Sequence, residues 1–360
     1  MGKLLPMKKS SLLLVSLLFL LLVKSSAQSV SYTVLEDDPN RVKQISLSLE
    51  PFYSDFYLEN ATIGWSLRAD ALLMKRIEGR FSFNKGYFDV IQSTSDIGNL
   101  MKPESGLKDN AGMEIGGSFF LIDHNSRRPI RVVLSSHKSG NTTYTQYMNV
   151  SAHRRFMLGV RGGFRQGATN FEIESDMKNE FFAVNVNNDK DSVHFGDFGI
   201  SVDGMDVYSA YTVQRQTLMY AGIDLRRVTN LVVQADGYNR KKSNRMINNF
   251  SFDYLIAPYI GFKNIHSATK TWRVETPNGI IKRTGWRVGW MLRAPNLPYL
   301  AFKGEFGSYP GIKIKTMTMK NYFINVSLGL NIPIGYKPKA TPSDIAKPAP
   351  ADAPAAPENK

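Results

Sequence analysis

The chain of 360 residues contains no cysteine. This absence excludes disulfide bonds, thiolate metal sites and a lipid-modified cysteine behind a signal sequence. After residue 27 the sequence also lacks any run of 18 apolar residues, so no membrane-spanning helix is predicted. Any segment of the mature chain that crosses a membrane must therefore do so in a form other than a helix.

Patterns typical of catalysis are missing as well. The five histidines lie far apart, at His124, His137, His153, His194 and His266. None has the i, i+4 partner of a metal-binding helix, and neither a Gly-x-Ser-x-Gly elbow nor a phosphate loop occurs. The glycines of Gly159–Gly163 lie within a predicted strand, where they are structural. We therefore expect a protein that is not an enzyme and that holds no metal or cofactor.

The first 27 residues have the features of a cleaved secretory signal. Lys8 and Lys9 precede the apolar run Leu12–Val23, and small residues at positions 25–27 offer a cleavage site before Gln28. The apolar run is too short to cross a bilayer comfortably, which argues against the alternative of an uncleaved anchor. We predict a signal peptide over residues 1–27.

The chain is basic, with a formal net charge of +14. Removal of the signal takes four lysines and no acid, which leaves 14 − 4 = +10. The basic residues are scattered among alternating segments, without a basic helix or an aromatic RNA-binding run, so nucleic acid is not an expected partner. We expect the positive charge to lie on a polar surface or in a polar lumen.

The stretch Tyr322–Ile334 shows the pattern that dominates the mature chain. Its even-numbered positions are all apolar, whereas positions 325–331 carry small or polar residues at every odd number. This period of two predicts a β-strand with one apolar and one polar face. Ile63–Leu73 repeats the pattern, with Leu67 on the apolar face and Arg68 and Asp70 on the polar face. A strand of a soluble sandwich alternates in the same way, so the architecture depends on how often the pattern recurs.

The pattern recurs along the whole mature chain, as short alternating segments typical of a membrane-spanning β-barrel. The further segments are Gln44–Leu49, Ile77–Phe83, Met113–Leu121, Phe156–Phe164, Met219–Leu225, Phe250–Ile256, Trp286–Leu292 and Leu300–Phe306. At roughly 22–25 residues for each strand with its connection, the mature chain predicts about 12–14 strands, and an even number is expected. Strict up-and-down alternation requires one more strand, for which Val202–Tyr211 is the candidate.

The connections between these segments differ in length. Short connections are predicted at Met74–Arg76, Asp123–Pro129, His153–Arg155 and Ala294–Pro298. Long connections are predicted at Asp89–Asn110, within Gln166–Gln216, at Tyr238–Asn249 and at Gly261–Arg283. Bacterial outer-membrane barrels have short periplasmic turns and longer outer loops, whereas a soluble sandwich or propeller does not sort its loops in this way. Aromatic residues near the predicted strand ends fit an interfacial girdle, as at Phe52, Tyr53, Tyr87, Tyr259, Tyr322 and Phe323.

The composition changes after the last predicted strand. The final segment carries Pro342, Pro348, Pro350, Pro354 and Pro357 among alanine, lysine and aspartate, with no aromatic residue. Such a segment cannot bury a core and is predicted to be an extended, disordered tail that the barrel does not need for folding. The expected organisation is a signal peptide (1–27), an N-terminal periplasmic lead-in (28–40), an outer-membrane barrel (41–336) and a periplasmic tail (337–360).

The chain resembles outer-membrane β-barrel proteins of the Bacteroidota-type envelope, which are porin-like barrels. The resemblance rests on the signal ending before Gln28, on the aromatic alternation Gly285-Trp286-Arg287-Val288-Gly289-Trp290 and on Leu328-Gly329-Leu330-Asn331-Ile332. It implies an integral outer-membrane location, with membrane lipid and other envelope proteins as partners. Asp191-Ser192-Val193 resembles the short O-glycosylation pattern of secreted proteins from that group, which makes Ser192 a candidate modification site.

Charged residues that alternate with lipid-facing ones must point into the lumen, because a strand turns its side chain at every step. The candidate lumen-lining residues are Arg68, Asp70, Glu114, Arg161, Arg165, Arg226, Arg227, Asp253 and Arg287. Unpaired arginines would form a positive constriction that attracts small anions. Arginines paired with Asp70, Glu114, Asp224 or Asp253 would close the barrel instead.

Two functions are compatible with this lumen. The favoured one is a structural or accessory subunit of a larger envelope complex, with a closed barrel. The alternative is a porin-type channel whose basic lumen favours small anionic solutes.

Overall fold

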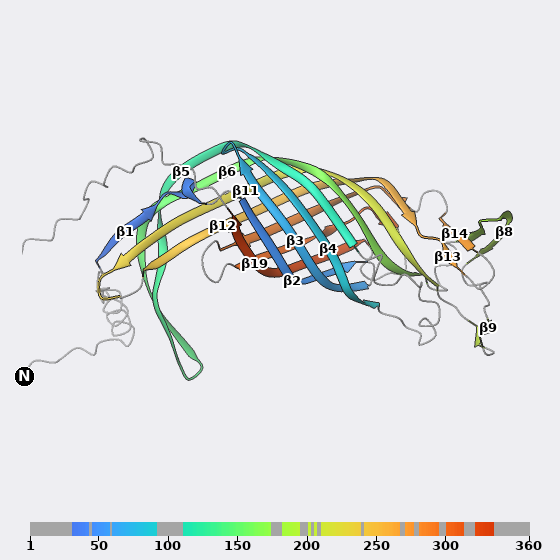
Figure 1. Cartoon of the computed structure of the whole chain (residues 1–360), viewed down its shortest axis with the longest axis horizontal. Helices are drawn as coiled ribbons and strands as arrows, with labels where there is room; N and C mark the ends of the chain where they lie inside the picture. Colours follow the sequence, from blue (N-terminus) through green and yellow to red (C-terminus); the bar gives the residue numbers. More distant parts are fainter. Residues whose placement is uncertain are drawn as a thin grey trace, which may run out of the picture.

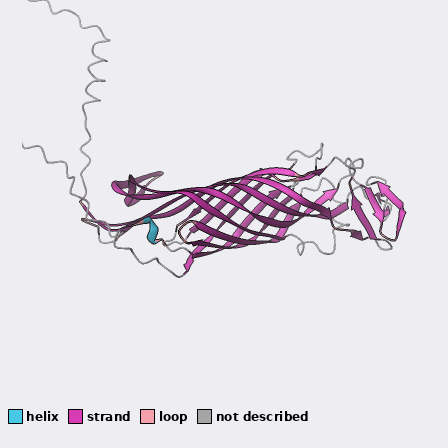
Figure 2. Cartoon of the chain, turned by 90° about the horizontal axis from the view of Figure 1, so that it is seen from above, coloured by secondary structure: helices cyan, strands magenta, loops and turns pink. Residues whose placement is uncertain are grey.

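The computed structural model describes residues 31–42, 45–57, 60–91, 111–173, 182–194, 201–202, 205–206, 210–238, 241–266, 271–276, 281–294, 300–312 and 321–334. The predicted signal peptide (1–27) and tail (337–360) lie outside the described residues. No helix in the described ranges is both long enough and apolar enough to span a bilayer. The helical element there is the short 3-10 helix η1 (Pro39–Arg41), coloured cyan in Figure 2.

Ten antiparallel strands form a closed barrel (Figure 1). They follow one another around the ring in sequence order, β19 pairs with β2, and β6 pairs with β11, so the topology is up-and-down. The strands are β2 (Ile45–Tyr57), β3 (Asn60–Leu73), β4 (Ile77–Ile91), β5 (Ala111–Ser139), β6 (Thr142–Ile173), β11 (Ala210–Ala235), β12 (Lys242–Phe262), β16 (Thr284–Arg293), β17 (Leu300–Ser308) and β19 (Tyr322–Ile334). The prediction of an all-β, antiparallel barrel is confirmed.

The strands are staggered, as closure of a barrel requires. The stagger is seen by following register partners around the ring. The path starts at Ile45 and passes through Ala71, Gly79, Gly117, Gly162, Ala221, Tyr254, Trp286 and Ser308 to Tyr322. Tyr322 precedes Phe323, the partner of Tyr57, so the path returns to β2 at its opposite end. The strands therefore run at an angle to the barrel axis.

The predicted number of 12–14 strands is wrong, because four strands are much longer than the alternation suggested. The predicted connections Asp123–Pro129 and His153–Arg155 lie inside β5 and β6, which have 29 and 32 residues. Tyr238–Asn249 lies largely in β12. Past the ring these strands no longer separate a polar interior from an apolar exterior, so the pattern that marks a barrel strand is lost there. Val202–Tyr211 adds no strand to the ring; it contains part of β9 (Ser201–Val202), β10 (Met205–Asp206) and the start of β11.

The long strands build a second structure beyond one end of the ring. Residues 125–139 of β5 and 142–153 of β6, here called the arm, leave the barrel together as a hairpin (Figure 1). Pairing of β6 with β11 ends at Thr229, and β1 (Tyr32–Asp37) takes the vacated edge of β11. Asp37 binds His153, accepting hydrogen bonds from its backbone N–H at 2.7 Å and contacting Nδ1 at 2.8 Å. Part of the predicted lead-in (28–40) is thus a strand.

The arm packs against the extended end of β11. This apolar cluster is made of Ile130, Val132, Leu134, Met148, Val150, Ala152, Leu231, Val233 and Ala235. The three β11 residues have odd numbers, like exposed Met219 and Ile223 on the outside of the barrel. The arm therefore covers the continuation of the outer face of β11.

Small sheets lie at the opposite end of the barrel. Four short strands form one of them: β7 (Phe182–Asn185), β8 (Asn188–His194), β13 (Ile265–His266) and β14 (Thr271–Glu275). β9 pairs with β10, and β15 (Ile281–Lys282) pairs with β18 (Gly311–Ile312). At the arm end, by contrast, β3 and β4 are joined by a tight turn in which Met74 and Lys75 have positive φ.

The barrel is polar inside and apolar outside. On β19 the even-numbered residues are exposed, with Leu330 at 51% exposure, whereas Asn325, Ser327 and Asn331 are buried. On β3, Arg68 and Asp70 are buried between partly exposed apolar neighbours. The predicted facing of Ile63–Leu73 is confirmed.

Two opposed glycines make room for an interior tyrosine. A side chain at Gly116 of β5 or at Gly163 of β6 would meet the Tyr220 hydroxyl at 2.0 or 2.5 Å. We predict that Gly116→Val destabilises the fold by about 1–3 kcal/mol, the range for overpacking of a filled interior. Gly79→Val is the matched control, because a side chain there meets open space. Denaturant unfolding followed by tryptophan fluorescence measures both variants, and equal losses in the two would contradict the prediction.

Candidate functional site

The interior of the ring is filled by charged side chains of both signs. Eight basic and eight acidic residues form ion pairs with one another there. The basic residues are Arg68, Arg80, Arg161, Arg165, Arg226, Arg287, Arg293 and Lys303, and the acidic ones are Glu50, Asp55, Asp70, Glu78, Glu114, Asp224, Asp253 and Glu305. Every strand of the ring except β19 contributes at least one of them. These charges balance, so the interior is neutral as a whole.

One group of ion pairs is centred on Arg287 of β16. Its guanidinium donates to both carboxylate oxygens of Glu114, at 2.8 and 2.9 Å, and to Asp253 at 2.8 Å. Glu305 lies 3.4 Å away. Arg287 is 1% exposed and sits over the ring of Tyr220, with 4.7 Å between its Cζ atom and the ring centroid. The Arg287–Glu114 pair joins β16 to β5, which is four strands away by the shorter way around the ring.

A second group lies nearer the arm end and crosses the ring completely. Arg293 of β16 contacts Asp70 at 3.0 Å and Glu78 of β4 at 3.5 Å. Since β16 and β4 are five strands apart in a ring of ten, this pair joins opposite walls. Arg226 of β11 contacts the same Glu78 at 2.6 Å. Arg80 bridges Glu78 at 2.5 Å and Asp224 at 2.6 Å.

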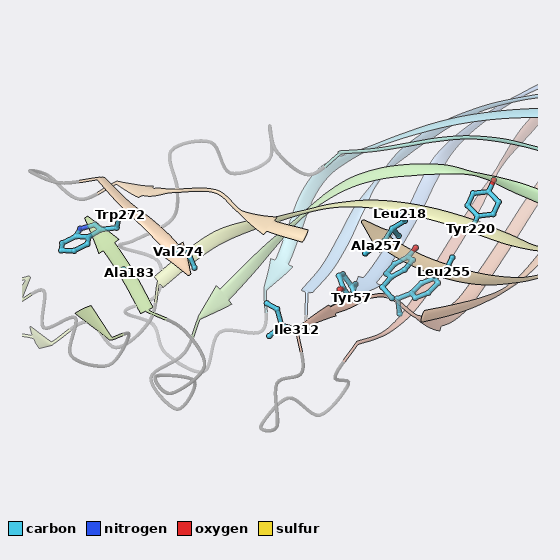
Figure 3. Close-up of a cluster of buried hydrophobic side chains, with 11 residues drawn as sticks. Tyr57, Ala183, Leu218, Tyr220, Leu255, Ala257, Trp272, Val274 and Ile312 are labelled. Carbon is cyan, nitrogen blue, oxygen red and sulfur yellow. The ribbon is translucent and has the colours of Figure 1, made fainter. Parts of the chain in front are cut away.

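Apolar clusters border this charged region at both ends. At the arm end, Leu72, Phe120 and Met157 form a small buried cluster. At the opposite end, a larger cluster includes Tyr57, Leu218, Leu255, Tyr309 and Phe323, part of which is drawn in Figure 3. The rings of Tyr309 and Phe323 stack with centroids 3.6 Å apart, and the Tyr309 hydroxyl accepts a hydrogen bond from Arg165. The ion pairs therefore lie in a shielded interior, where they are stronger than in water.

The space left in the interior is small. A cavity of 40 Å³ is lined by Arg68, Arg80, Glu114 and Arg161 among others, which is room for no more than a few water molecules. Arg68 lies 2.5 Å from Glu50, yet its guanidinium nitrogens donate no hydrogen bond of good geometry within the described part of the chain. Water in the adjoining cavity could accept these bonds. This cavity is too small for a solute larger than a few water molecules.

The structure places most of the sequence-predicted lumen residues in this network. Those inside are Arg68, Asp70, Glu114, Arg161, Arg165, Arg226, Asp253 and Arg287. Arg227 requires a correction, because it is exposed on the outer face. Its neighbour Arg226 points inward, and adjacent residues of a regular strand cannot share a face.

The sequence analysis missed several interior residues. Glu78 and Arg80 lie on the polar face of the predicted segment Ile77–Phe83, and strand alternation alone would have placed them inside. Arg293 lies one residue beyond the predicted segment that ends at Leu292. Of the predicted aromatic girdle, Phe52, Tyr87, Tyr259 and Tyr322 are exposed, whereas Tyr53 and Phe323 are buried in the interior.

Other candidate sites are sparse. Ser192 is exposed on β8. Within the described ranges, histidines and carboxylates form no group that could hold a metal ion. His153 binds Asp37, and His137 stacks on Tyr144 in the arm.

Removal of one interior arginine should be costly. We predict that Arg287→Met lowers the free energy of unfolding by about 3–5 kcal/mol, because Glu114, Asp253 and Glu305 then remain buried without their partner. Arg273→Met is the matched control. Arg273 pairs with Glu275 on the half-exposed surface of β14, where a pair contributes about 0–1 kcal/mol. Denaturant titration of both variants measures the difference, and a similar small loss in each would refute the structural role of Arg287.

Comparison with known proteins adds no family assignment: no protein-family model matches the chain, and no curated protein matches it significantly.

Proposed function

We propose that this chain is an integral outer-membrane β-barrel, closed by interior ion pairs, that works as a non-enzymatic structural or accessory subunit of a larger envelope complex. The observation that carries the proposal is the inverted distribution of side chains. The largest fully buried side chains include Arg287 and Arg293, while leucine, isoleucine and phenylalanine cover the outside. In water this arrangement would expose an apolar surface around the whole ring.

A bilayer explains the inversion. Lipid favours apolar side chains on the outside, and a closed ring leaves no backbone edge unpaired within the hydrocarbon. The row Ile324, Val326, Leu328, Leu330 and Ile332 on β19 illustrates the outward surface. Phe306 on the adjacent strand β17 and Phe250 and Phe252 on β12 belong to the same outward surface.

The lengths of the connections support an orientation. Those at the end of the small sheets include residues 92–110, 174–209 and 263–283, whereas 74–76, 140–141 and 236–241 connect strands at the arm end. The connection 58–59 is the short exception at the former end. Because bacterial barrels have short turns on the periplasmic side, we assign the arm end, with β1 and the tail after β19, to the periplasm.

A closed interior favours a subunit over a channel. Ion pairs from Arg293 and Arg287 cross the lumen, and apolar clusters cover both ends. The alternative, a porin with a basic lumen that selects small anions, requires an excess of unpaired positive charge inside. The described interior has eight charges of each sign instead.

The arm offers a surface for a partner protein. Val133, Tyr144 and Tyr147 are exposed on it, and the Arg131 guanidinium lies over the Tyr147 ring at 4.1 Å. Tyrosine and arginine are enriched at protein–protein interfaces. Residues 124–171 contain no acid, so a partner with acidic groups would suit this surface.

The membrane proposal predicts the effect of a charge on the outer face. Leu67→Arg should cost on the order of 2–4 kcal/mol if the residue lies near the bilayer midplane. Leu67→Phe is the control, because it keeps the site apolar. Folding into lipid vesicles, followed by heat-modifiable migration, measures both variants. Extraction of the wild-type protein from membranes by high salt or carbonate would end the membrane proposal.

Because its interior is closed, the barrel is predicted not to conduct ions. Purified wild-type protein in planar bilayers should show no stable single-channel conductance, because side chains cross the lumen. Mass identification of proteins that co-purify with it should return other envelope proteins. A stable, anion-selective conductance that falls in Arg161→Ala or Arg287→Ala would favour the porin alternative.

A further inference from the structure

Three arginines converge where the arm leaves the barrel. Arg227 of β11 is opposite Phe156 of β6, and Arg154 lies two residues from Phe156 on the same face. Arg154 is opposite Ser126 of β5, and Arg128 lies two residues beyond Ser126. The three residues thus form a diagonal across neighbouring strands, a spacing of roughly 7–8 Å that long side chains bridge. The positive charges of Arg227 and Arg128 both act on Arg154.

These arginines differ from those of the interior, because they have no acidic partner among the described residues. The acids of the same region are engaged elsewhere. Asp37 binds His153, Asp123 binds Arg155 at 2.6 Å, and Glu36 binds Arg245.

The Arg154 side chain also has one donor without an acceptor among the described residues. Its Nε atom is buried and donates no hydrogen bond within the part of the chain that the structure describes. A buried donor without an acceptor is costly, and three adjacent positive charges repel one another. An anionic ligand with several acceptor oxygens would relieve both.

The position of the diagonal identifies the source of the anion. On the outer face of β6 the exposed residue Val160 is followed by Leu158, Phe156 and then Arg154. On β11, Ile223 and Leu225 lead in the same way to Arg227. The arginines therefore begin where the apolar surface ends, which is the depth of lipid headgroups if the apolar surface lies in the hydrocarbon.

We propose that Arg128, Arg154 and Arg227 form a binding site for the headgroup phosphate of an anionic phospholipid. The proposal rests on the membrane-spanning part of the proposed function. Guanidinium groups bind phosphate oxygens through paired, charge-assisted hydrogen bonds. A net negative headgroup matches the three unpaired charges better than a zwitterionic one. The lipid would also fix the angle at which the arm leaves the barrel, since the three arginines come from the arm, from its base and from the wall beside it.

Native mass spectrometry of the detergent-solubilised full-length protein tests the site. Phosphatidylglycerol and phosphatidylcholine with identical acyl chains are the probes. The wild type should retain phosphatidylglycerol preferentially, and the triple variant R128Q/R154Q/R227Q should bind it at least about tenfold more weakly, since each basic residue near an anionic surface contributes about 1 kcal/mol. R127Q/K138Q/K241Q removes the same charge from exposed residues near the same end and should keep the preference. Heat-modifiable migration verifies that both variants are folded.

Four outcomes would overturn the proposal. If the triple variant and the control bind phosphatidylglycerol equally, the three arginines do not form a site. If excess inorganic phosphate displaces the lipid completely, the cluster is a site for free phosphate. If carbonate extracts the wild-type protein from membranes, the proposed function itself fails, and the lipid site fails with it; an integral barrel without lipid preference refutes the lipid site alone.

Discussion

The structure depends on the neutralisation of charge inside the ring. The strands turn every second side chain inward, and apolar clusters at both ends keep the interior from bulk water. Each inward charge must therefore find its partner among the other interior side chains. Arg293 reaches Asp70 and Glu78, and Arg287 reaches Glu114 and Asp253. The pairs of Arg293 and the Arg287–Glu114 pair cross the ring, so they fix distant strands relative to one another and fill the space between them. Removing one partner of such a pair leaves the other charge unpaired in a low-dielectric interior. Single substitutions in the network are therefore strongly destabilising.

Much of this architecture could be predicted from the sequence, because facing in a strand follows from a period of two. Alternation around Leu67 is enough to place Arg68 and Asp70 on the polar face, and recurrence of the pattern along the chain predicts an all-β barrel. The number of strands could not be predicted in the same way. Alternation marks a strand only where its two faces meet different surroundings, and β5 and β6 lose that contrast beyond the ring. There the arm buries Ile130, Val132 and Leu134 on a face that is exposed further along the barrel. The pairing of interior charges could not be predicted from the sequence either, because partners such as Arg293 and Glu78 are 215 residues apart.

The two ends of the barrel differ in what they present to the surroundings. At one end the long strands continue as the arm, held by β1 and by the apolar cluster around Leu231 and Val233. At the other end the connections build small sheets, and Trp272 and Val274 belong to the same buried cluster as Tyr57 (Figure 3). A rigid, filled barrel between two elaborated ends suits a scaffold that holds both surfaces in a fixed relation. A conducting pore would gain nothing from ion pairs that span its lumen.

The net charge of the chain is distributed unevenly between the interior of the ring and the remaining residues. The whole chain carries +14, and the eight basic and eight acidic residues of the interior contribute 8 − 8 = 0 to it. The interior residues that the structure describes therefore contribute nothing to the positive excess. Residues 124–171, which form most of β5 beyond the ring and most of β6, contain no acid at all. The chain thus places paired charges where water is excluded and unpaired arginines where the apolar surface ends. Attraction to anionic groups at that boundary then requires no rearrangement of the barrel, because the interior charges are already paired with one another.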